Sequence, residues 1–267
     1  MLLGLIEGWT EFFPISSTGH LIVAAELIGF EAQNAQVFEV VIQLGAILAV
    51  LWVYRARFAA MLRNLDRPGA EQRLTCNLIL AFVPAALVGF FAIGPIKRYL
   101  FNAPSVGLAL LLGGALILWV EARPRVARVL SVDQIGWRDA LKVGCAQILA
   151  LVPGTSRSGA TIIGGLLFGL ERRAATEFSF FLALPTMLAA TAYDVYRHHA
   201  LFSSQDLPVF TAGFVMAFVS ALLAVRVLIR FVGAHSFKAF AWYRIGFGSL
   251  ILASWQLDWI AWNLQAI

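Results

Sequence analysis

Long apolar runs, separated by short polar stretches, dominate the sequence. Six of these runs are long enough to cross the hydrocarbon core of a bilayer, which takes about 20 helical residues. They cover residues 36–54, 75–96, 105–121, 174–196, 208–232 and 242–263. The pattern predicts an all-α integral membrane protein with six spanning helices.

Two further apolar regions, residues 1–30 and 139–170, contain a polar interruption near the middle. The first interruption reads Pro14-Ile-Ser-Ser-Thr-Gly19 and the second reads Pro153-Gly-Thr-Ser-Arg-Ser-Gly159. Non-helical backbone at membrane depth is tolerated only where protein buries it or where it lines a wet cavity. We therefore expect two re-entrant helix-loop-helix segments, each marking part of a functional site.

The basic residues support this layout through the positive-inside rule. If 1–30 enters from outside and 139–170 from inside, the cytoplasmic segments are 55–74, 122–142, 171–173 and 230–241. These segments hold fourteen of the 20 Lys and Arg residues, whereas the external segments hold only Lys97, Arg98 and Arg197. Arg226 and Arg244 are expected near inner helix ends. The basic clusters are interpreted as a solvated face next to anionic lipid.

The layout also predicts a duplication within a single polytopic domain covering 1–267. Each half has a broken helix followed by a helix that opens with a glutamate, at Glu39 or Glu177. The halves, about 1–121 and 122–267, would enter the membrane from opposite faces. Such an inverted repeat places its site near the midplane, where the repeats meet.

Composition excludes other classes. The chain is 60% hydrophobic and 13% charged, with a mean hydropathy of +0.81, whereas soluble domains carry about 25% charged residues. The charges are spread too thinly for a nucleic-acid partner to follow from the net charge of +5. Cys76 and Cys145 offer neither a disulfide framework nor a zinc spacing. The start of the chain has no basic segment before its short apolar stretch, so no cleavable signal peptide is expected.

Glu7 and Glu11 form the first candidate constellation. They are four residues apart, so on a helix both carboxylates project from one face. Two like charges in an apolar segment are costly unless a cation or a proton relieves them. Carboxylate oxygens suit a divalent cation such as Mg²⁺ or Ca²⁺. The alternative is a protonated carboxyl group bonded to its neighbour without a catalytic task.

Hydroxyl groups and a histidine follow the acidic pair. Ser16, Ser17 and Thr18 come after Pro14, where the first half-helix must end. They can cap the next half-helix, whose free N–H groups bind anions; pure capping is the alternative for Ser16. His20 is the only histidine expected within the membrane. It is interpreted as an acid–base group, with a purely structural histidine as the alternative.

Arg157 distinguishes the second interruption. An arginine at the bilayer midplane is costly and cannot lose its charge, so it must meet an anion, and its planar fork suits phosphate. A salt bridge to Glu7 or Glu11 without substrate is the alternative. Together the two interruptions predict a phosphate-binding site with acid–base chemistry, and a site within the membrane points to a lipid phosphate.

These motifs resemble those of one family, the undecaprenyl-diphosphate phosphatases of bacteria, also known as bacitracin-resistance proteins. The resemblance covers essentially the whole chain, although the family usually has a longer segment before the first helix. It rests on four blocks: Glu7-Gly-x-Thr-Glu-Phe-x-Pro-x-Ser-Ser-Thr-Gly-His20, Phe38-Glu-Val-Val-Ile-Gln-Leu-Gly45, Pro153-Gly-x-Ser-Arg-Ser-Gly-Ala-Thr161 and Ala175-Thr-Glu-Phe-Ser-Phe180.

The resemblance implies hydrolysis of undecaprenyl diphosphate to undecaprenyl phosphate and inorganic phosphate. This reaction recycles the lipid carrier of cell-wall synthesis and confers bacitracin resistance. The expected location is the bacterial inner membrane, with several membrane passes. The expected partners are an isoprenyl diphosphate lipid and the bilayer, with a homodimer as an option and no nucleic acid.

The resemblance also implies roles for individual residues. Glu7 and Glu11 would hold a divalent cation or handle protons. Arg157, with Ser156 and Thr161 in support, would clamp the diphosphate, and Ser16 and Thr18 would bind phosphate as well. Ser17 and His20 are both candidates for nucleophile or acid–base; we favour His20, because a serine hydroxyl needs an activating partner.

Two other classes of protein share parts of this pattern. The acid-phosphatase-like lipid phosphatases carry a histidine six residues past their arginine, but position 163 is Ile and no histidine follows Arg157 before His198. A lipid-phosphate transporter or flippase is the alternative from another class, because broken helices in inverted repeats are a transporter plan. It stays open, alone or together with hydrolysis.

Overall fold

Helices account for nearly every apolar run. The computed structural model describes residues 1–30, 35–123, 126–198, 206–260 and 262, and within them it contains no strand, only an isolated bridge between Val129 and Leu170. The prediction of an all-α protein is confirmed. The elements are α1 (Leu2–Thr10), α2 (Ser17–Leu27), α3 (Ala35–Val53), α4 (Arg55–Arg63), α5 (Ala70–Leu100), α6 (Ala103–Ala122), η1 (Val132–Gln134), α7 (Trp137–Gln147), η2 (Ile148–Leu151), α8 (Arg157–Leu167), α9 (Arg172–His198), α10 (Leu207–Val232) and α11 (Lys238–Gln256).

Within the described residues, four helices are long and apolar enough to cross a membrane: α5, α6, α9 and α10. A fifth candidate arises if α3 and α4, which are bent by 77° at Tyr54, are counted as one span. The predicted run 242–263 corresponds to α11, which is not among these candidates. Arg244 lies within α11 and lowers its hydropathy. Residues 261 and 263 of the predicted run lie outside the described residues. The same holds for Arg125 of the second basic segment.

Both predicted interruptions are breaks between helices. The first separates α1 from α2, and the second separates α7 and the 3₁₀ turn η2 from α8. Each break ends on a serine with a left-handed backbone, Ser16 with φ 72° and Ser156 with φ 71°. Their hydroxyls accept hydrogen bonds from the Gly19 and Gly159 amides, at 3.5 and 3.0 Å. The same N-terminal cap therefore starts α2 and α8.

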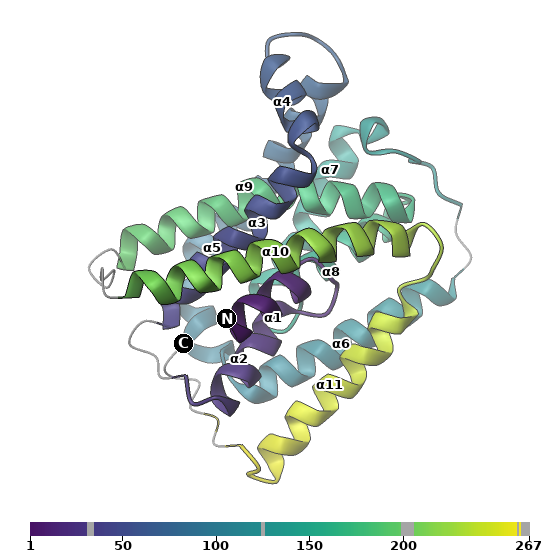
Figure 1. The fold of residues 1–267 in the computed structure, drawn as a ribbon. Helices are drawn as coiled ribbons and strands as arrows, with labels where there is room; N and C mark the ends of the chain where they lie inside the picture. The colour runs from purple at the N-terminus through teal and green to yellow at the C-terminus, as the bar shows by residue number, and fades with distance from the viewer. Residues whose placement is uncertain (31–34, 124–125, 199–205, 261, 263–267) are drawn as a thin grey trace.

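The helices pack in pairs that repeat between the halves (Figure 1). The first part of each broken helix lies on a long helix of the other half: α1 on α10 and α7 on α5. Similarly, α3 contacts α10 and α9 contacts α5, while α6 and α11 pair with one another. Glycines allow the close approach, since a Cβ atom at Gly45 would lie 2.6 Å from the Phe214 carbonyl oxygen of α10.

Polar contacts connect the four basic segments to one another. Arg57, after α3, forms an ion pair with Asp133. Arg172, at the start of α9, pairs with Glu121 at 2.5 Å, and the Phe237 amide donates to the same carboxylate at 3.0 Å. Segments far apart in sequence thus lie together at one end of the helices.

Candidate active site

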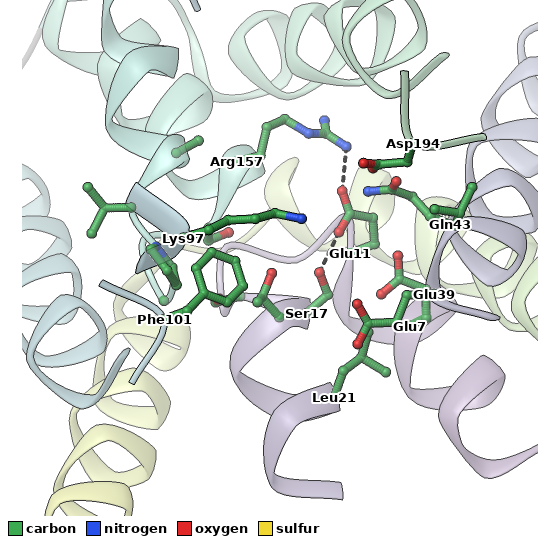
Figure 2. A pocket seen from close by; sticks show the side chains of 18 residues that line it. Glu7, Glu11, Ser17, Leu21, Glu39, Gln43, Lys97, Phe101, Arg157 and Asp194 are labelled. Carbon is green, nitrogen blue, oxygen red and sulfur yellow. Dashed lines mark hydrogen bonds and ion pairs between the residues drawn. The ribbon is translucent and has the colours of Figure 1, made fainter. Parts of the chain in front are cut away.

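A cavity of about 270 Å³ lies between the two breaks, where parts of both halves meet (Figure 2). Its walls come from α1, α2, α3, α5, α8, α9 and the two connecting loops. Its polar lining consists of Glu7, Glu11, Ser16, Ser17, Thr18, Glu39, Gln43, Lys97, Ser156, Arg157 and Asp194.

The Glu11 carboxylate joins the two breaks. One oxygen, Oε2, accepts a 2.5 Å hydrogen bond from the Ser17 hydroxyl, and the other, Oε1, accepts a 2.8 Å bond from Nη2 of Arg157. The Glu11 and Arg157 side chains are 9% and 12% exposed, which leaves the pair accessible only from the cavity. A hydroxyl, a carboxylate acceptor and a guanidinium therefore adjoin one another, and groups of these types can take part in phosphoryl transfer.

Arg157 is also hydrogen-bonded to α9. Its Nη1 donates to the Ser179 carbonyl at 3.2 Å. Thr161 lies outside the cavity lining: its hydroxyl donates to the Arg157 carbonyl at 2.9 Å and lies 2.6 Å from Oγ of Ser179. Thr161 therefore contacts the backbone of Arg157 and the side chain of Ser179, which fits a supporting position, and its role in phosphate binding stays a prediction.

His20 is not brought together with the acidic pair. Its Nδ1 lies 2.7 Å from the Ser16 carbonyl and its Nε2 lies 2.7 Å from the Tyr243 hydroxyl. The ring stacks on Phe247 and lines a separate apolar groove. Because a carbonyl can only accept, Nδ1 donates to Ser16, and in a neutral ring Nε2 would accept from the Tyr243 hydroxyl. In this arrangement His20 stabilises the turn that precedes Ser17.

Arg244 is a buried charge whose position the sequence analysis missed. It is 1% exposed, and its guanidinium donates to the carbonyls of Pro14 (3.1 Å), Thr155 (2.9 Å) and Gly154 (3.1 Å). Two further bonds reach carbonyls of α6. It thus binds the backbone of both breaks. Its place inside an apolar run was the available signal, but the sequence analysis expected it near an inner helix end.

Glu39 and Glu177 occupy equivalent places in the two halves but different surroundings. Glu39 lines the cavity, together with Gln43 one turn further along α3. Glu177 pairs with Arg173 at 3.0 Å, away from the cavity. Lys97 and Asp194, which the sequence analysis did not select, also line the cavity.

The cavity supplies oxygen donors for a hard cation. Glu7, Glu11, Glu39 and Gln43 line it. Over the part of the chain that the structure describes, no three or more His, Cys, Asp or Glu residues lie at metal-ligand spacing. Carboxylates in ones and twos are typical of Mg²⁺ sites that are completed by substrate phosphate and water.

Comparison with known proteins agrees with the motifs. The family model of bacitracin resistance protein BacA matches residues 1–250. An undecaprenyl-diphosphatase of Laribacter hongkongensis is 59% identical over 261 residues, which cover 98% of this chain and 96% of that protein. An undecaprenyl-diphosphatase of Pseudomonas aeruginosa PAO1 is 56% identical over 262 residues, covering 98% and 95%. The chain therefore belongs to the family of bacitracin resistance protein BacA.

Proposed function

We propose that the protein hydrolyses undecaprenyl diphosphate to undecaprenyl phosphate and inorganic phosphate, which recycles the lipid carrier of cell-wall synthesis and confers bacitracin resistance. The observation that carries this proposal is the Glu11 carboxylate bonded to both the Ser17 hydroxyl and the Arg157 guanidinium. The substrate follows from the names of the family members and from the intramembrane setting. The test is phosphate release from undecaprenyl diphosphate by protein purified in detergent.

In the proposed reaction Ser17 is the nucleophile. Its Oγ attacks the terminal phosphorus and its proton passes to Oε2 of Glu11, while the bond from that phosphorus to the bridging oxygen breaks. The proton then passes to the departing isoprenyl monophosphate. Water attacks the phosphoserine and Glu11 accepts a proton from that water, while the bond between phosphorus and Oγ of Ser17 breaks. Glu11 returns the proton to Oγ, and inorganic phosphate leaves. Arg157 stabilises the charge on the transferred phosphoryl group.

Ser17 and His20 can be separated by experiment. The Ser17 to Glu11 bond would supply the activating partner that the serine needs, whereas both His20 nitrogens are already bonded, to the Ser16 carbonyl and the Tyr243 hydroxyl. Ser17→Ala should abolish an acid-stable phosphoenzyme. His20→Asn keeps a donor near the Ser16 carbonyl and should retain substantial turnover. Complete loss of turnover in His20→Asn, together with the absence of an acid-stable phosphoenzyme in wild type, would favour His20 as the reacting group.

The remaining polar groups would bind the substrate and a divalent cation. Glu7 and Glu11 would hold Mg²⁺ or Ca²⁺, which when bound neutralises charge on the phosphoryl oxygens. Ser16, Thr18 and Ser156 would donate to phosphate oxygens, near the N-terminal ends of α2 and α8.

We further propose the membrane arrangement: six spanning helices and two re-entrant segments, arranged as an inverted repeat in one domain. The repeated helix pairs support it, because exchanging the halves turns the α1 and α10 contact into the α7 and α5 contact. The ion pairs that join the basic segments support a common cytoplasmic face. In the same scheme, Lys97 and Asp194 near the opposite helix ends line the cavity, so the site would open to the outer face of the inner membrane.

Thiol labelling tests this topology. In a background with Cys76 and Cys145 replaced by alanine, cysteines at positions 67 and 128 should resist a membrane-impermeant reagent added outside intact cells. A cysteine at position 102 should react. Labelling at 67 or 128 from outside would contradict the topology. Whether the protein forms a homodimer is tested separately, by light scattering of the detergent-solubilised protein.

A transporter or flippase interpretation is less favoured, because the closely related proteins are named as diphosphatases. The phosphate-release assay distinguishes the two functions, since detergent removes any membrane across which a lipid could move. Absence of turnover in detergent, together with lipid movement in vesicles, would favour the transporter.

A further inference from the structure

The cavity is lined by more acidic than basic side chains. The carboxylates of Glu7, Glu11, Glu39 and Asp194 face two cations, Arg157 and Lys97. A diphosphate would bring additional negative charge on two phosphoryl groups. Arg157 is already bonded to Glu11 and to the Ser179 carbonyl, so only part of its fork is available. A second cation at the cavity would strengthen binding of a diphosphate in particular.

Lys97 lies where such a cation is needed. It occupies the last turn of α5, two residues after Pro95, and Figure 2 shows its ammonium pointing into the cavity towards Glu11, with Phe101 beside its stem. Among the residues that the structure describes, no carboxylate is within ion-pair distance of this ammonium. Its three N–H donors are thus available for a ligand.

Arg98, the residue after Lys97, does not reach the cavity. Arg98 carries the same charge on the same helical turn, but its guanidinium lies over the Tyr99 ring, 5.4 Å from the centroid, and does not line the cavity. Of these two adjacent cations, α5 therefore directs only Lys97 into the site. Arg98 is a matched control in charge and in position along the chain.

We propose that Lys97 is a substrate-binding residue that binds the phosphoryl group not held by Arg157, and that it thereby makes the site favour diphosphates over monophosphates. This inference rests on the proposed diphosphatase function. A lysine suits the task, because its ammonium is a compact charge on a flexible stem and adapts to a phosphate without needing bidentate geometry. The competing explanation is that Lys97 only balances the cavity carboxylates.

The experiment compares Lys97→Gln and Lys97→Arg with Arg98→Gln and wild type, at a fixed excess of divalent cation. KM and kcat are measured for a long-chain isoprenyl diphosphate. Calorimetry measures binding of methylenediphosphonate, a non-hydrolysable diphosphate, and of methylphosphonate, its monophosphate counterpart. We expect Lys97→Gln to raise KM and the Kd for methylenediphosphonate by about tenfold, a loss of one charge-assisted contact.

The same variant should change the Kd for methylphosphonate much less, Lys97→Arg should be intermediate, and Arg98→Gln should match wild type. Unchanged KM and Kd in Lys97→Gln, with or without a lower Tm, would overturn the proposal and leave charge balance as the role. A fall in kcat alone would overturn it as well. If wild type released no phosphate, the proposed function would fail, whereas the diphosphonate binding data would still decide the role of Lys97.

Discussion

The two helix breaks share a backbone and differ in chemistry. Ser16 and Ser156 have almost the same φ, and each caps an eleven-residue helix through the glycine amide three residues on. The position after the cap is Ser17 in the first break and Arg157 in the second. The two breaks therefore share a backbone frame, and they differ in the side chains that would carry the chemistry.

The helices before the breaks differ in the same way. Counting back from each capping serine, Glu7 corresponds to Gln147 and Glu11 corresponds to Leu151. Gln147 is 1% exposed and its amide donates to Thr186 at 3.3 Å. The first half thus contributes Glu7, Glu11 and Ser17, and the second half contributes Arg157. The site is asymmetric although its scaffold is repeated, because a phosphoryl group needs a cation on one side and a nucleophile on the other.

Replacing Arg157 should have the largest effect. We expect Arg157→Ala to lower the rate of phosphate release by about 10³-fold, as loss of a charge-stabilising arginine does in other phosphoryl transfers. Arg157→Lys should recover part of the rate, since it keeps the charge without the fork. Wild-type turnover in Arg157→Ala would show that the second break takes no part in the reaction.

The acidic pair should come next. Glu11→Gln and Glu7→Gln should each lower kcat by about 10²-fold, because Glu11 is the proposed general base and Glu7 a proposed ligand of the divalent cation. EDTA should abolish activity, and Mg²⁺ or Ca²⁺ should restore it. Gln147 offers the matched control, because Gln147→Ala changes the equivalent residue of the other half. Activity that is indifferent to EDTA would exclude the divalent cation.

Arg244 should affect both breaks together. Arg244→Met leaves the carbonyls of Pro14, Gly154 and Thr155 without their shared donor. We expect a lower Tm and about tenfold lower kcat, since each hydrogen bond to a charged group contributes about 1.5–3 kcal/mol. Arg244→Lys should recover little, because one ammonium cannot span these acceptors. Wild-type Tm and turnover in Arg244→Met would show that the breaks are positioned independently of it.

The capping serines should give the smallest effects. Ser16→Ala and Ser156→Ala should each cost about 1 kcal/mol, the usual value for an N-cap. Ser16→Gly should be milder, because glycine adopts the left-handed φ at this position without strain. Thermal unfolding in detergent measures both. If alanine were tolerated as well as glycine at both positions, the caps would not determine where α2 and α8 begin.

Much of the fold could be predicted from residue order. Runs of about 20 apolar residues must be helical in a bilayer, because every backbone N–H and C=O then bonds within the segment. Pro14 and Pro153 with their flanking small polar residues predicted both breaks, since proline cannot continue a helix. The family followed from motifs of residue types at fixed spacing.

The candidate site was predicted less completely, because sequence spacing does not say which face of a helix reaches the cavity. His20 is three residues from Ser17, yet α2 turns it away from Glu11 and towards Tyr243. Thr161 lies close to Arg157 in sequence, but its hydroxyl bonds to the Arg157 carbonyl and it does not line the cavity. Glu39 and Glu177 could not be told apart until packing brought one to the cavity and the other to Arg173.

The sequence by itself determined the helices, the two breaks and the charges that had to be neutralised in an apolar interior, since these depend on local backbone hydrogen bonding and on the cost of burying charge. Only the tertiary structure decided which charges meet. Arg157 reaches Glu11 across 146 positions of the chain, and Arg244 reaches Pro14 across 230. Contacts at such separations arise from helix packing, which no local pattern specifies.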